Sequence, residues 1–164
     1  MEDVQTKQGK NAAALFNGDF FLIETCSGHR LLHDDPAGAQ HYLDPRISDE
    51  VLGAAVLDAL GRSRFLPIEE ARVLRQGAGE RYEQWKGAVM ARYGYKTKRS
   101  LFGDMARCSI RMTGNTIKIV PTNHDKLEGW GREKGDGIED VVIPANSPAT
   151  EVGAALRLAF KRCT

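Results

Sequence analysis

The sequence lacks any apolar run close to the eighteen or so residues that a membrane-spanning helix needs. The apolar run over residues 12–16 is also too short for the core of a signal peptide. Cysteine is scarce, since Cys26, Cys108 and Cys163 are the only three and form no C-x-x-C pair. An odd cysteine count without a secretory signal argues against a disulfide scaffold and indicates a reducing compartment. We therefore expect a cytoplasmic protein in which each cysteine is a small buried apolar side chain.

An excess of charge of one sign is missing as well, because 23 basic and 22 acidic residues leave a formal net charge of +1. A nearly neutral chain has no global field that would attract nucleic acid or a membrane surface, so any electrostatic partner site must be a local patch. With 164 residues, the chain is long enough for one domain that buries roughly 70% of its unfolded surface without disulfides or metal ions.

Motifs that carry catalysis are absent. There is no G-x-S-x-G elbow, and the glycine pair at Gly77 and Gly79 lacks the lysine and the hydroxyl of a phosphate-binding loop. One group has residue types that could bind a metal, but it fits no zinc spacing and is better explained as a polar loop. Its members are His29, His33, Asp34, Asp35 and His41. We predict a protein that is not an enzyme and holds no cofactor or metal; a metalloenzyme using this loop is a minor alternative.

One helical pattern occurs twice, one hundred residues apart. Residues 52–63 align without a gap with residues 152–163, and a glycine, three alanines and an arginine are identical. In each copy the apolar residues follow the i, i+3, i+4, i+7 spacing of one helix face, and Ser48 can cap the first copy. Gly53 and Gly153 each weaken a helix by about 1 kcal/mol relative to alanine. Because this cost is repeated, we expect a strand or another helix to approach closely at both glycines.

Other periodicities predict further helices and strands. Helical spacing occurs over residues 68–74 and 80–93, and alternation over residues 107–112 and 116–119 predicts a β-hairpin. The fold class is therefore α/β (mixed α+β), with a mixed, mostly antiparallel sheet of about five or six strands packed against about four helices.

The sequence predicts a short N-terminal segment followed by one domain. Residues 1–17 indicate an N-terminal arm that is flexible or forms a short helix, and residues 18–164 indicate a single domain. Within that domain, residues 127–130 are a candidate third strand of the hairpin sheet. The fully apolar residues 141–143 predict a short strand at the centre of the sheet.

Basic residues form one local concentration next to Tyr95 and Phe102, whose rings could stack on bases while the cations hold phosphates. They are Lys96, Lys98, Arg99, Arg107 and Arg111. A small nucleic-acid-binding module that uses this segment is the alternative function, although a solvated helix end explains the same residues.

Four further segments form a set when they are taken together. They cover residues 52–66, 93–102, 121–130 and 142–163, and their most specific parts are Tyr-Lys-Thr-Lys-Arg and Gly-Ala-Ala-Leu-Arg-Leu-Ala. This set resembles the CdiI immunity proteins of bacterial contact-dependent growth inhibition. The resemblance extends over roughly residues 18–163, nearly the whole chain.

The resemblance implies a small cytoplasmic protein that binds the C-terminal toxin domain of a large exported CdiA-type protein in a tight one-to-one complex. Such toxins are frequently nucleases, and an immunity protein of this family neutralises its toxin without catalysis. The near-neutral charge departs from the acidic character of many nuclease inhibitors, so plugging of the toxin's active site and binding at an exosite both stay open. Acidic residues in or beside predicted loops are the candidate rim of the interface. They are Asp34, Asp35, Glu69 and Glu70.

Overall fold

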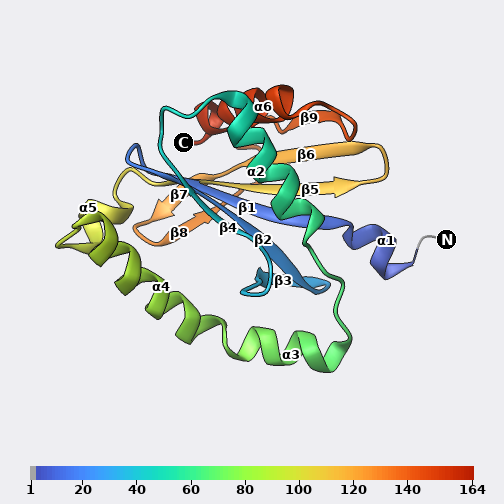
Figure 1. Ribbon diagram of the computed structural model, residues 1–164, viewed down its shortest axis with the longest axis horizontal. Coiled ribbons are helices and arrows are strands. Elements are labelled where there is room, and N and C mark those ends of the chain that lie inside the picture. The colour runs from blue at the N-terminus through green and yellow to red at the C-terminus, as the bar shows by residue number, and fades with distance from the viewer. Residues whose placement is uncertain (1–2) are drawn as a thin grey trace.

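A seven-stranded antiparallel sheet forms the middle of the molecule in the computed structural model, which describes residues 3–164 (Figure 1). Its strands follow the order β3-β2-β1-β5-β6-β9, and β4 also pairs with β2. A separate two-stranded sheet contains β7 and β8. The strands are β1 (Lys10–Phe16), β2 (Phe21–His29), β3 (Leu31–Asp34), β4 (Gln40–Leu43), β5 (Ala106–Thr113), β6 (Thr116–Pro121), β7 (Asn123–Lys126), β8 (Gly129–Gly131) and β9 (Val141–Pro144).

Helices lie on both sides of this sheet. Figure 1 shows α2 and α6 together on one side, with α3 and α4 on the other. The predicted mixed α/β fold with a mostly antiparallel sheet is confirmed. None of the helices in the described part of the chain has the length and apolar character that crossing a membrane requires. The helices are α1 (Val4–Gln8), α2 (Asp49–Gly61), α3 (Ile68–Gln76), α4 (Ala78–Tyr93), α5 (Lys98–Phe102) and α6 (Ala149–Arg162).

The two similar helices, α2 and α6, pack against each other. A Cβ atom on Gly53 would lie 1.7 Å from the carbonyl oxygen of Ala149, and one on Gly153 would lie 1.9 Å from that of Asp49. Only glycine fits such a reciprocal contact, because the backbones themselves touch. The expected close approach is confirmed at both glycines, and each helix is the other's neighbour. Ser48 also caps α2 as predicted, since its hydroxyl accepts a hydrogen bond from the Val51 amide at 3.2 Å.

The main core lies between this helix pair and the sheet. Alternate residues of β1, β5 and β6 face the helices, because successive side chains of a strand point to opposite faces. Leu52, Val56 and Leu156 are fully buried against them. The sheet residues that share this core include Ala12, Ala14, Ile23, Cys108, Ile110, Ile117 and Ile119.

Three predictions about single elements are wrong. Residues 10–16, expected in an N-terminal arm, form β1 in the middle of the sheet between β2 and β5. Its alanines favour strands weakly, but small side chains at Ala12 and Ala14 suit a strand that lies under closely packed helices. β9 lies at the edge of the sheet next to β6, not at its centre, and Val142 is 56% exposed there. The strand expected at residues 127–130 becomes β8, which pairs with β7 outside the main sheet.

Candidate partner-binding site

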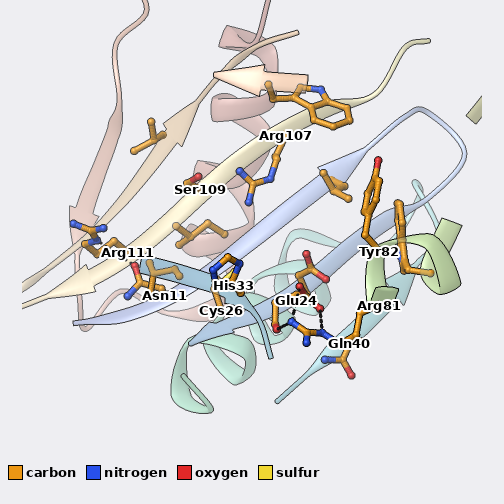
Figure 2. Close-up of a pocket in the computed structure, with 18 of the residues that line it drawn as sticks. Asn11, Glu24, Cys26, His33, Gln40, Arg81, Tyr82, Arg107, Ser109 and Arg111 are labelled. Atoms are coloured by element: carbon orange, nitrogen blue, oxygen red, sulfur yellow. Dashed lines mark hydrogen bonds and ion pairs between the residues drawn. The ribbon is translucent and has the colours of Figure 1, made fainter. Parts of the chain in front are cut away.

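The sheet face opposite α2 and α6 is hollow. A cavity of about 750 Å³ opens there, with the strands as its floor and α4 at one end (Figure 2). Its polarity follows from strand alternation in β5. Cys108 and Ile110 belong to the main core, so Arg107, Ser109 and Arg111 project to the other face and line the cavity. The floor of the cavity is therefore polar, whereas the opposite face of the same strand is apolar.

Two arginines on β5 give one side of the cavity a positive charge. Arg107 and Arg111 flank Ser109 along the strand, as Figure 2 shows. Among residues 3–164, no acidic side chain pairs with either guanidinium within 4 Å. Arg111 is held by Asn11, whose side-chain oxygen accepts a hydrogen bond from Nε at 3.1 Å. Two cations without an acid in direct contact can therefore bind an anionic group from outside the chain.

Acidic residues on β2 and β3 line the other side. Burial, together with the negative charge of Asp34, raises the pKa of Glu24 to about 7, although Arg107 and Arg81 pull it downward. Asp34 already has an ion-pair partner, because Arg81 of α4 donates to its carboxylate at 2.9 Å. The same guanidinium also donates to the Leu74 carbonyl oxygen at 2.9 Å. Glu24 accepts no hydrogen bond from any side chain or backbone amide of the described residues. It thus changes protonation near neutral pH and is free to pair with a donor.

Two buried polar atoms among the lining residues have no hydrogen-bond partner. They are His33 Nε2 and Trp85 Nε1. A buried nitrogen without a partner is uncommon in folded proteins and destabilises by about 1–3 kcal/mol. Both nitrogens are enclosed by the chain itself, so they contribute to the cavity wall rather than to its open surface.

The end of the cavity under α4 is aromatic and firmly held. Tyr82 donates to Glu128 at 2.8 Å, and Lys86 pairs with the same carboxylate at 2.5 Å. Trp130 donates from Nε1 to the Met105 carbonyl oxygen at 2.7 Å. The two contacts with Glu128 fasten α4 to the turn between β7 and β8, so this wall exists before any partner arrives. The aromatic residues Tyr82 and Trp85 of α4 pack against a second core around Phe20, Phe102 and Met105.

The four acids expected at the rim of an interface occupy three different environments. Asp34 lines the cavity in its ion pair with Arg81. Asp35 is fully buried: Arg64 donates two hydrogen bonds to its carboxylate, at 2.8 and 2.9 Å, and Ser27 donates a third. Glu69 and Glu70 are exposed on the first turn of α3. A rim role for Asp34, Glu69 and Glu70 stays a prediction, while Asp35 has no surface that a partner could touch.

The five basic residues of the alternative patch separate into two groups. Arg107 and Arg111 line the cavity. Lys96, Lys98 and Arg99 are exposed before and within α5, a short helix that the sequence did not reveal, and they are not among the cavity residues. Lys98 lies 3.8 Å from Glu128.

The histidine-rich loop does not come together as a metal site. His41 Nε2 lies 2.7 Å from an Asp58 oxygen, and His29 Nδ1 lies 3.1 Å from the Leu66 carbonyl oxygen. Within residues 3–164, no group of three or more His, Cys, Asp or Glu side chains is arranged to hold a metal ion.

Sequence reasoning missed Glu24, Arg81 and Trp85 as cavity residues. Only Glu24 left a signal, since it is the one charged residue in the apolar run over residues 20–26. Arg81 and Trp85 reach the cavity from α4, and no local pattern indicates which strand face a distant helix will cover.

Comparisons with known proteins agree on the family. The family described as CDI immunity protein, CdiI, matches residues 10–163. The immunity protein CdiI-YPIII of Yersinia pseudotuberculosis serotype O:3 (strain YPIII) is 41% identical over 166 aligned positions, covering 93% of this chain and 94% of that protein.

Solved structures give the same result. A CdiA-CT/CdiI toxin and immunity complex from Yersinia pseudotuberculosis contains a chain that is 40% identical, with a TM-score of 0.86 and coverage of 94% of this chain and 97% of that one. A protein of unknown function from Neisseria meningitidis, NMB0488, is 32% identical, with a TM-score of 0.88 over 100% of both chains. The chain therefore belongs to the CdiI family of CDI immunity proteins.

Proposed function

We propose that this chain binds and neutralises the C-terminal toxin domain of its cognate CdiA protein, one to one, inside the cell that produces both. The similarity to the immunity chain of a CdiA-CT/CdiI complex supports this partner. The observation that carries the choice of surface is the cavity, which is lined by the charged side chains of Arg107, Arg111 and Glu24.

The cavity defines the chemistry of the toxin segment that enters it. A carboxylate of the toxin segment would pair with Arg107 and Arg111, and a hydrogen-bond donor or a cation would pair with Glu24. An apolar side chain of the toxin segment would pack against Tyr82 and Trp85 at the aromatic end of the cavity. Such a segment would pair with the charged groups that line the cavity, and contacts of this kind dominate affinity when water is excluded around them.

Charge reversal on the cavity floor tests the surface. The double variant Arg107→Glu/Arg111→Glu should raise the Kd for the toxin domain by about 100-fold or more, because it places like charges against the toxin carboxylate. Arg46→Glu/Lys161→Glu is the matched control: both residues are exposed and neither lines the cavity, so its Kd should stay within about threefold. Calorimetric titration gives both values, and circular dichroism verifies folding.

Two results would count against the proposal in different ways. Equal binding by a folded cavity variant and the wild type would remove the cavity as the surface but keep the function. Failure of the wild-type chain to bind the toxin domain, or to rescue cells that express it, would remove the function itself.

The acidic rim is tested separately. Asp34→Ala/Glu69→Ala/Glu70→Ala should lower the association rate and alter its salt dependence, because rim charges act mainly on encounter. Asp35 is left unchanged in this variant, since its burial would confuse binding with folding. An association rate equal to that of the wild type at low and high salt would remove these residues from the interface.

We propose further that the toxin is a nuclease, as is frequent in this family. Incubation of the toxin domain with RNA and with DNA should degrade one of them, and an equimolar amount of this chain should stop the degradation. A toxin that leaves both polymers intact would contradict this part of the proposal alone.

The nucleic-acid-binding alternative uses the five basic residues of the predicted patch, which are Lys96, Lys98, Arg99, Arg107 and Arg111. It predicts binding of labelled RNA or DNA that weakens steeply as salt rises. We expect no binding at low salt, because the chain is nearly neutral and its basic residues are divided between two places.

A further inference from the structure

Two of the three cysteines meet on the helix-covered side of the sheet. Cys108 Sγ of β5 lies 3.7 Å from Sγ of Cys163, the residue that ends α6. Cys108 is fully buried and Cys163 is half-buried. Two backbone hydrogen bonds fix the chain around Cys163. The Cys163 amide donates to the Phe160 carbonyl oxygen at 3.2 Å, and the Thr164 amide donates to the Thr122 carbonyl oxygen at 3.2 Å. The sulfurs therefore stay adjacent rather than meeting by chance.

From this geometry we infer that Cys108 and Cys163 form a reversible disulfide modification site, which closes under hydrogen peroxide and opens with a dithiol reductant. A disulfide has an S–S distance of about 2.05 Å, so the sulfurs must approach by roughly 1.7 Å. Rotation of the half-buried Cys163 side chain supplies most of this movement. Cys26 is buried elsewhere and has no cysteine partner among the described residues.

Burial assigns different roles to the two thiols. Cys163 is half-buried and can be reached from solvent, whereas Cys108 is fully buried. Cys163 is therefore the thiol that peroxide reaches first: after it loses its proton, its sulfur bonds to one peroxide oxygen, the O–O bond breaks, and the departing hydroxide takes up a proton as water. The Cys108 thiol then attacks the Cys163 sulfenic acid, and the S–O bond breaks as water leaves with the Cys108 proton. Two thiols are oxidised and one peroxide is reduced to two waters.

The disulfide would join β5 to the end of α6 directly behind Arg107 and Ser109, on the opposite face of the sheet from the cavity. A cross-link between residues 55 positions apart removes conformational entropy from the unfolded chain. We expect Tm to rise by roughly 5 °C or more on oxidation and to return to its reduced value after reduction. This site does not depend on the proposed toxin partner.

Intact-mass measurement of the purified chain after treatment with a few equivalents of hydrogen peroxide tests the inference. We expect a loss of about 2 Da, a peptide in which Cys108 is linked to Cys163, and the rise in Tm. Cys163→Ser should abolish all three changes, and its half-exposed position makes it the variant that folds most readily. Cys26→Ser is the matched control and should retain them.

Three results would overturn the inference. They are the addition of two or three oxygens to Cys163 without cross-linking, a disulfide that joins two copies of the chain, and a rise in Tm that persists in Cys163→Ser.

Discussion

The two faces of the sheet differ in how completely the chain fills them. On one face, α2 and α6 pack so closely that their backbones touch at Gly53 and Gly153, and the side chains beneath them are fully buried. On the other face, α4 covers only one end and leaves a cavity lined by Arg107, Arg111 and Glu24. The filled face needs no further molecule to be stable. The hollow face presents charged groups that can pair with groups of another molecule, so the filled face serves folding and the hollow face is the candidate for binding.

The largest expected effect is on the filled face. Gly53→Ala places a Cβ atom 1.7 Å from the Ala149 carbonyl oxygen, so α2 and α6 must separate. We expect a loss of about 3–4 kcal/mol in the free energy of unfolding, at the upper end of overpacking effects and despite the better helix propensity of alanine. Urea denaturation followed by circular dichroism measures this.

Gly87→Ala is the matched control on the other side of the sheet. Gly87 lies inside α4, and a Cβ atom there would meet no atom within 4 Å. This substitution should stabilise the protein by roughly 0.5–1 kcal/mol, because alanine is the better helix former. Equal effects of the two substitutions would show that the glycine contact between α2 and α6 is not what distinguishes the faces.

A smaller loss in the free energy of unfolding is expected from a substitution at Asp35. This buried acid stabilises the fold, whereas the exposed acids are available to a partner. Burial alone would raise its pKa, but hydrogen bonds from Arg64, Ser27 and the Ala37 amide outweigh burial and lower it below the usual 3.8. Asp35→Ala should destabilise by about 2–3 kcal/mol at pH 7, because Ser27 and Arg64 both lose their acceptor.

The pH dependence of this contribution has a definite sign. A carboxyl whose pKa is lowered on folding stabilises the protein above its unfolded pKa and loses that contribution as pH falls. The difference between wild type and Asp35→Ala should therefore shrink as the pH falls below about 3.8. The exposed Glu70→Ala should change stability by less than about 0.5 kcal/mol throughout. A loss of similar size at Glu70 would remove the distinction between the two acids.

The filled face was largely predictable from sequence, and the hollow face was not. The apolar spacing and repeated glycines of residues 52–63 and 152–163 indicated close helix packing, because these signals are local and periodic. The alternation in residues 107–112 also placed Arg107 and Arg111 on the face opposite the core. What the sequence could not indicate is that β1, rich in alanine, lies in the middle of the sheet. Strand order depends on pairing between distant segments, and it decides which residues share a cavity.

The environments of the acidic residues were also not predictable from local sequence. Asp34 and Asp35 are adjacent in sequence, yet one lines the cavity and the other is buried with Arg64. Neither arginine partner lies near them in sequence, since the pairs join residues 47 and 29 positions apart. Charge clustering alone therefore overestimates how many acids are free for a partner.

A substitution at Glu24 should have an intermediate effect on the free energy of unfolding, and its pH dependence should be opposite to that of Asp35. Burial and Asp34 raise its pKa from 4.5 to about 7, so the folded state holds its proton more tightly than the unfolded chain. Its contribution is fully present below pH 4.5 and is lost as the pH rises through 7. Glu24→Gln removes this loss, so the variant should exceed the wild type by about 1–3 kcal/mol at pH 8. Urea denaturation between pH 4.5 and 8 measures the difference, and a constant difference between the two proteins would contradict it.

The smallest effect on stability is expected from Arg111→Ala on the cavity floor. Arg111 is exposed, forms no ion pair with a described residue and donates one hydrogen bond to Asn11, so its loss should change the free energy of unfolding by less than about 0.5 kcal/mol. Its effect on the Kd for the toxin domain should be at least tenfold, because the toxin carboxylate loses a guanidinium partner. A residue on the filled face should behave in the reverse way: Leu156→Ala on α6, which removes a fully buried side chain, should destabilise the fold by about 2–5 kcal/mol and leave the Kd of the remaining folded protein unchanged. If Arg111→Ala instead destabilised the fold and left Kd unchanged, the cavity floor would serve folding, and the contrast between the two faces would fail.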